Sequence, residues 1–169
     1  FYYSAFQGNK DKTNKEENRH WFGNGMYDRG ATGVAMLRRD GFASMDASTQ
    51  PGTLTTRPVI FTGKSLFVNA AIPEGKLRVE IRDVEGNPIA PFTLENSIPF
   101  SGDKTITALH WKDVCDLSIL AGKPVRFHFE MTNGSLYSFW VSKDETGRSD
   151  GYLAGGGIGY PDIIDTVGK

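Results

Sequence analysis

The feature that most restricts the fold of this chain is a strict alternation of apolar and polar side chains in two segments. Residues 76–83 (KLRVEIRD) carry an apolar side chain at every second position, and residues 125–131 (VRFHFEM) repeat the pattern. A period of two places alternate side chains on opposite faces of a β-strand, so one face is expected to be buried and the other solvated. Such half-buried strands are typical of antiparallel sheets. The two segments therefore predict an antiparallel, all-β fold.

Shorter apolar segments between turn residues extend this pattern from Gly33 onward, which is typical of an all-β sandwich or barrel. Further strands are predicted within residues 33–39, 41–47, 53–61, 65–71, 104–111 and 135–142. Helix is expected only as a single turn in DVCDLSILAG, where Asp113 or Asp116 could cap the turn and Gly122 would end it. We therefore predict about eight strands and very little helix.

Composition limits the classes of partner. A chain of 169 residues is long enough for one domain with a proper core. Its formal net charge of -1 gives no large field to attract nucleic acid or a membrane surface, so neither is an expected partner. No apolar segment approaches the roughly 20 residues that a membrane-spanning helix needs. The single cysteine, Cys115, is predicted to be a buried apolar residue rather than a nucleophile.

Side chains that could carry catalysis or bind a metal show no recognisable spacing. The three histidines, His20, His110 and His128, belong to no metal or nucleophile motif. Glu80 and Glu130 fall on polar strand faces, where they are expected to be solvated or salt-bridged. The oxygens of DVEGN (residues 83–87) could hold calcium, but the segment is far shorter than a calcium-binding loop and fits a hairpin turn. We predict no catalytic residue, no metal and no cofactor in this chain.

Specific motifs follow one another along residues 33–142. They are LRRDGFAS, LTTRP followed by F-x-G-K-x-L-F-V-N, R-V-E-I-x-D-x-x-G-x-P-I, and D-L-S-x-L-A-G-K-P-V-R-F. In this order they resemble the C-terminal β-sandwich of bacterial glycosyl hydrolases whose N-terminal part is a five-bladed β-propeller, similar to the invertase and arabinanase-like families. The resemblance implies a two-sheet antiparallel β-sandwich of jelly-roll type, with little helix, over residues 33–143.

The same resemblance assigns the ends of the chain. FYYSAF (residues 1–6) is similar to the closing strand of the last propeller blade, so residues 1–32 are expected to be a severed propeller strand and a connecting segment. Residues 144–169 are expected to be a Gly-rich tail. An unpaired apolar strand is prone to aggregate, so FYYSAF should pair with an edge of this domain, pair with a neighbouring molecule, or be disordered.

By resemblance, the catalytic carboxylates lie in the propeller and none is carried over to this chain. The implied function is that of a non-catalytic accessory domain that stabilises or packs on the catalytic propeller, which would be its partner. The alternative is a carbohydrate-binding module that holds the glycan substrate. An independent glycosidase is the least supported reading, because no acid/base pair is recognisable. A periplasmic or extracellular location is implied by the resemblance alone.

A candidate glycan face follows from the Asn133-Gly134 pair, which predicts a two-residue hairpin turn. That register directs Trp140 to the core. The opposite face would gather five side chains: Arg126, His128, Glu130, Tyr137 and Phe139. Either another part of the protein or the propeller covers this face, or Tyr137 and Phe139 stack on a sugar while the three polar residues bind its hydroxyls.

Overall fold

The computed structural model describes residues 1–8 and 29–149 of the chain. They belong to two units, Phe1–Arg38 and Arg39–Lys169, each described by itself. The first unit contains strands β1 (Tyr2–Phe6) and β2 (Gly30–Val34). The second contains β3 (Met45–Ala47), β4 (Gly52–Thr55), β5 (Ser65–Arg82), β6 (Phe100–Leu109), β7 (Arg126–Thr132) and β8 (Gly134–Ser142).

Helix is almost absent from the described residues, as predicted. A single 3-10 turn, η2, spans Ser118–Leu120, where the Asp116 carboxylate accepts a hydrogen bond of 2.7 Å from the Ser118 amide. Gly122 follows with a φ of 78°, a conformation that favours glycine. The all-β, antiparallel class is confirmed. The domain boundary expected at residue 33 falls inside β2, and the first unit ends at Arg38.

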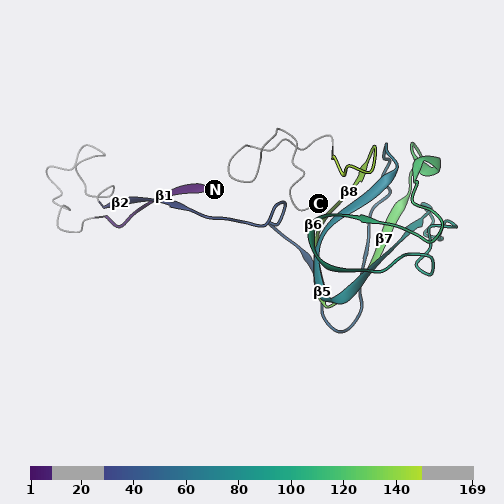
Figure 1. Cartoon of the computed structure of the whole chain (residues 1–169), viewed down its shortest axis with the longest axis horizontal. Coiled ribbons are helices and arrows are strands. Elements are labelled where there is room, and N and C mark those ends of the chain that lie inside the picture. Colours follow the sequence, from purple (N-terminus) through teal and green to yellow (C-terminus); the bar gives the residue numbers. More distant parts are fainter. Residues whose placement is uncertain (9–28, 150–169) are drawn as a thin grey trace. The chain divides into compact units, whose positions relative to one another are not determined.

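Strand β5 organises the second unit (Figure 1). The sheet order is β3-β8-β5-β7-β4, and β6 pairs with β5 as well. The first half of β5 pairs with β8, from Ser65 opposite Ser142 onward, and the second half pairs with β7, ending at Arg82 opposite Arg126. The segments predicted as two strands, 65–71 and 76–82, are therefore one bent strand of 18 residues.

Two glycines allow the bend. A Cβ atom on Gly75 would lie 1.7 Å from the Thr132 carbonyl oxygen, and one on Gly134 would lie 2.7 Å from the Ala71 carbonyl oxygen. Neighbouring Asn133 takes a positive φ of 46°. The backbones of β5 and of the β7-β8 junction thus approach each other at a shared corner. The bent sheet is nearly barrel-shaped, so the two-sheet jelly-roll arrangement is not confirmed.

The prediction that Asn133-Gly134 closes a hairpin is wrong. Among the described residues, β7 and β8 pair with successive halves of β5 and not with each other. Within β8 the register shifts between the pairs Asn69–Ser138 and Ala70–Leu136, which leaves Tyr137 as an extra residue. Such a bulge reverses the alternation of side chains beyond it.

The bulge turns Phe139 inward and Trp140 outward, so the prediction of Trp140 in the core is also wrong. The Phe139 ring lies 5.5 Å and 5.0 Å, between centroids, from the rings of Phe127 and Phe129. Trp140 instead stacks on Phe67 at 5.9 Å.

The core lies inside the bent sheet and extends under the connections between strands. Leu77, Val79 and Ile81 are fully buried, as the alternation predicts. Phe92 and Trp111 add an edge-to-face ring pair at 5.2 Å. Cys115 lies in the connection between β6 and η2 and is exposed, so the prediction of a buried cysteine is wrong. Among residues 1–8 and 29–149, no helix has the length and apolar character needed to cross a membrane.

Candidate functional site

The predicted glycan face is only partly assembled. Arg126, His128 and Glu130 alternate along β7 with buried Phe127 and Phe129, so the three polar side chains share the face away from the core.

Phe139 is not brought to this face, because the bulge in β8 directs it into the core. Tyr137 is half-buried at the bulge itself. The structure thus keeps the polar set of the predicted face and removes one of its two aromatic residues.

The charged groups of this face serve internal contacts. Glu130 forms an ion pair with Arg78 of β5. Arg126 donates from Nε to the Val84 carbonyl at 3.2 Å and from Nη1 to the Thr56 carbonyl at 3.1 Å. These bonds connect neighbouring strands and loops. The ion pair of Glu130 agrees with the prediction that this carboxylate is solvated or salt-bridged.

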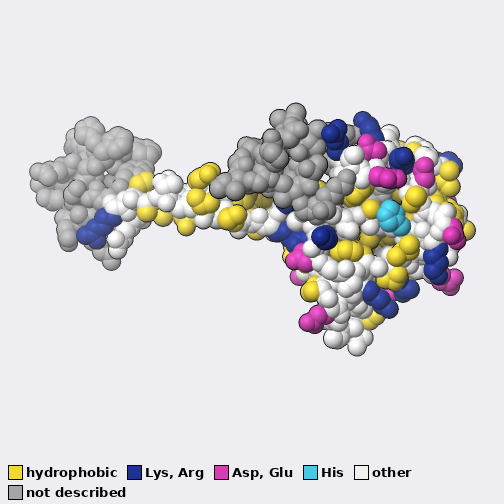
Figure 2. Space-filling model, viewed as in Figure 1, with side chains coloured by type: hydrophobic (Ala, Val, Ile, Leu, Met, Phe, Trp, Pro, Cys, Tyr) yellow, Lys and Arg dark blue, Asp and Glu magenta, His cyan; other side chains and the backbone are white. Residues whose placement is uncertain are grey.

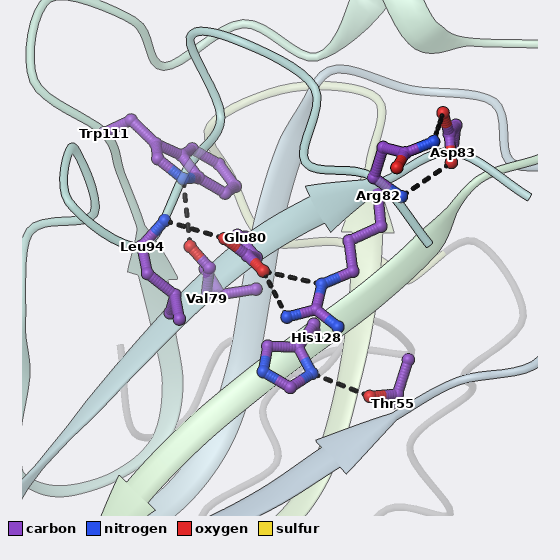
Figure 3. A network of polar contacts seen from close by, with 9 residues as sticks. Thr55, Val79, Glu80, Arg82, Asp83, Leu94, Trp111 and His128 are labelled. Atoms are coloured by element: carbon purple, nitrogen blue, oxygen red, sulfur yellow. Dashed lines mark hydrogen bonds and ion pairs between the residues drawn. The ribbon is translucent and has the colours of Figure 1, made fainter. Parts of the chain in front are cut away.

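His128 occupies the centre of the β4-β7-β5 surface. It is 7% exposed, and its Nδ1 lies 2.7 Å from the Thr55 hydroxyl (Figure 3). Burial lowers the pKa of His128 below its ordinary value of 6.5, and the positive charge of Arg82 lowers it further, against the opposing influence of Glu80 and Glu130. The imidazole is therefore neutral at neutral pH.

Glu80 is a buried carboxylate with three donors around it. It is 4% exposed and accepts hydrogen bonds from Arg82 Nε at 2.6 Å and from the Leu94 amide at 3.2 Å, and Arg82 Nη2 lies 2.5 Å away (Figure 3). Beside it, the Trp111 indole donates to the Val79 carbonyl at 3.0 Å. The sequence placed Glu80 on a polar strand face, but it did not predict that the loop containing Leu94 covers this carboxylate. This network holds residues 83–97 against β5.

The DVEGN segment is a turn that satisfies its own polar groups. Asn87 donates from its amide to Asp83 at 2.8 Å and from its side chain at 3.0 Å. These bonds lower the pKa of Asp83, first through the Asn87 side chain and then through its amide. No cluster of three or more His, Cys, Asp or Glu residues suited to a metal occurs in the described part of the chain.

The first unit is a two-stranded antiparallel ribbon with a repeated pairing of aromatic residues and glycines. Tyr3 lies opposite Gly33, and Phe6 lies opposite Gly30. Each ring covers its glycine, since an added Cβ would lie 2.5 Å from the Tyr3 ring or 2.8 Å from the Phe6 ring. Positions three apart in a strand face opposite sides, so each face of the ribbon carries one of these pairs.

Both faces of this ribbon are exposed and uncharged. Tyr2, Tyr3 and Phe6 are 84%, 53% and 48% exposed, and β1 and β2 contain no charged residue. Figure 2 shows hydrophobic side chains exposed on this unit, with Lys or Arg side chains beside them, and charges of both signs spread over the surface of the second. Exposed strand edges are usually protected by charges or proline, and this ribbon has neither.

No protein-family model, no curated protein and no solved structure matches the chain.

Proposed function

We propose that this chain is a non-catalytic accessory β-domain of a glycoside hydrolase, which packs on the catalytic propeller and stabilises it. The observation that carries the proposal is the β1-β2 ribbon, whose two faces are exposed, free of charged side chains and rich in aromatic residues. The glycoside hydrolase class of the partner is taken from the resemblance of the strand motifs.

A ribbon of this kind is suited to joining a larger sheet. Two-stranded ribbons are marginally stable alone, and strands that are apolar on both faces are typical of sheets covered on both sides. A propeller blade is such a sheet, because its neighbours flank it. Among the described residues, β1 and β2 pair with each other. Addition of a strand to such a pair is a common mode of recognition.

The second unit has the features of a support rather than a catalyst. Glu80 and Glu130 both bind arginines, and His128 is hydrogen-bonded to Thr55. Their polar groups stabilise the packing of strands and loops. Strand β5 bends at a corner between residues 65–71 and 76–82, and its two halves pair with different strands. This arrangement is compatible with the jelly-roll fold that we propose for the domain.

Binding to a purified propeller tests this function. The chain is mixed with a five-bladed glycoside hydrolase propeller encoded in the same or the adjoining reading frame, and the melting temperature of the propeller is measured. We expect a rise of several degrees, because a ligand of the folded state stabilises it by mass action. The double variant Tyr3→Ser and Phe6→Ser should abolish the rise.

The matched control is Ile119→Ser, which alters an apolar side chain that is 61% exposed in the second unit. Stabilisation that survives in the ribbon variant would show that the ribbon is not the docking element. Hydrolysis of aryl glycosides by the chain alone would refute the non-catalytic assignment.

A further inference from the structure

A hollow of about 350 Å³ lies on the outer surface of β5 and β6. Its volume is at the lower end of the roughly 300–1,000 Å³ typical of small-molecule sites. The lining residues are Ser65, Phe67, Ile106, Thr107, Ala108, His110 and Glu145. This place is distinct from the β7 face that the sequence suggested.

Polar side chains in the hollow have no partner within the described part of the chain. Ser65 is 5% exposed, and its hydroxyl oxygen keeps some contact with solvent. This hydroxyl forms no hydrogen bond within the described residues. The imidazole of His110 and the carboxylate of Glu145 likewise form no hydrogen bond or ion pair. The contrast with Glu80, Glu130 and Arg126 is clear, since those groups are all used internally.

The turn that carries Glu145 is held in place. The Trp140 indole donates to the Gly147 carbonyl at 2.9 Å, and Asp144 accepts a bond of 2.8 Å from the Thr146 amide. An added Cβ on Gly147 would lie 3.0 Å from both Phe67 and Ile106, so this backbone packs directly on the apolar floor of the hollow. The backbone on both sides of Glu145 is therefore held beside the hollow, and the Glu145 side chain is exposed there.

The chemistry of the lining selects a ligand class. A carboxylate accepts hydrogen bonds, a hydroxyl donates and accepts, and the ring nitrogens of an imidazole also form hydrogen bonds, a combination that suits hydroxyl groups. Ala108 and the small exposed parts of Phe67 and Ile106, which are each 3% exposed, offer an apolar surface for C–H groups. The Glu145 carboxylate repels anions. Neutral sugars combine hydroxyls with an apolar ring face.

We propose that this hollow binds a neutral saccharide, with Glu145, His110 and Ser65 as hydrogen-bonding residues on the floor of Phe67 and Ile106. The residues of this site all belong to the second unit, whereas the docking ribbon belongs to the first.

Amide NMR titration of the full chain tests the site. The probes are glucose, galactose, mannose, xylose and arabinose, with a disaccharide of each hexose, and sodium phosphate and acetate as anion probes. We expect saccharide-dependent shifts concentrated at Ser65, Phe67, Ala108, His110 and Glu145. Glu145→Gln should weaken binding about tenfold or more, because it removes a charged acceptor.

Glu74→Gln is the matched control, since Glu74 is exposed at the corner of β5, away from the hollow. It should leave the affinity unchanged, and His110→Ala should reduce it. Melting temperatures equal to that of the parent chain show that each variant is folded.

Three results overturn the proposal: no shift with any saccharide, saccharide affinity that persists in both Glu145→Gln and His110→Ala, or binding of the anions alone. Each is distinguishable from failure of the docking function, which is measured on the propeller and with ribbon variants.

Discussion

Gly75→Ala tests the corner at which β5 bends. The added Cβ would lie 1.7 Å from the Thr132 carbonyl oxygen, whereas real Cβ contacts are essentially never shorter than 3.0 Å, so the two strands must separate by at least about 1.3 Å. A main-chain hydrogen bond near 2.9 Å would lengthen beyond the range of a hydrogen bond. The substitution therefore breaks the sheet where Lys76 pairs with Thr132.

The expected loss of stability follows from these contacts. Overpacking costs about 1–3 kcal/mol, and one or two lost hydrogen bonds cost about 1 kcal/mol each. Alanine recovers about 0.4–1 kcal/mol by restricting the unfolded chain. Gly75→Ala should therefore lower the free energy of unfolding by about 2–4 kcal/mol, measured by urea titration with circular dichroism and fluorescence as parallel probes.

Gly52→Ala is the matched control within the same sheet. Its Cβ would lie 3.2 Å from the Ala47 Cβ, a contact that a backbone shift of a few tenths of an ångström relieves, so a change below about 1 kcal/mol is expected. Equal stabilities of the Gly75→Ala and parent chains would refute the close approach of β5 and β7 at the corner.

Three further substitutions probe the polar contacts of the second unit. Glu80→Gln should lower the free energy of unfolding by about 1–3 kcal/mol, because Arg82 loses its charged partner; an unchanged urea midpoint would contradict the network. Neutral His128 contributes stability that is complete above its ordinary pKa of 6.5 and is lost as the pH falls below that value. His128→Asn should therefore flatten the plot of unfolding free energy against pH between about pH 7 and 5, by at most about 1.4 kcal/mol per pH unit. Parallel plots for the variant and the parent chain would contradict this role of His128. Trp140→Phe should cost about 1 kcal/mol in chemical unfolding, because the bond to the Gly147 carbonyl is lost, and a neutral effect would show that this bond is not needed.

The strands were predictable because their signal is local. Alternation at Leu77, Val79 and Ile81 identified the buried face of β5 without knowledge of its partners. The carboxylates of Glu80 and Glu130 were expected to be solvated or salt-bridged, and both are salt-bridged.

The pairing partners were not predictable, because they depend on distant segments. Asn133-Gly134 has the composition of a hairpin turn, but β5 lies beside both flanking strands and the pair serves a corner instead. The bulge at Tyr137 has no distinct sequence signal, and it decided the opposite placements of Phe139 and Trp140. A candidate face drawn from alternation alone therefore lost its register at Tyr137, the fourth residue of β8.

The hollow was missed for a similar reason. His110 was judged by its lack of a motif, and Glu145 was placed in the tail region. They line one hollow because β6 pairs with β5 and the turn after β8 packs on Phe67. No spacing in the sequence connects residues 65, 110 and 145.

The central position of β5 also determines the order in which the domain can fold. Its first residue, Ser65, pairs with Ser142, and Lys76 pairs with Thr132, so the ladders close over long stretches of chain. Contacts of such high sequence separation slow folding, to milliseconds or seconds in β-rich domains. During synthesis β5 emerges well before β7 and β8. In the interval between them, β6 is the one partner strand of β5 that is synthesised. During this interval the edge of β5 is exposed, and the nascent chain is then most open to wrong strand pairing.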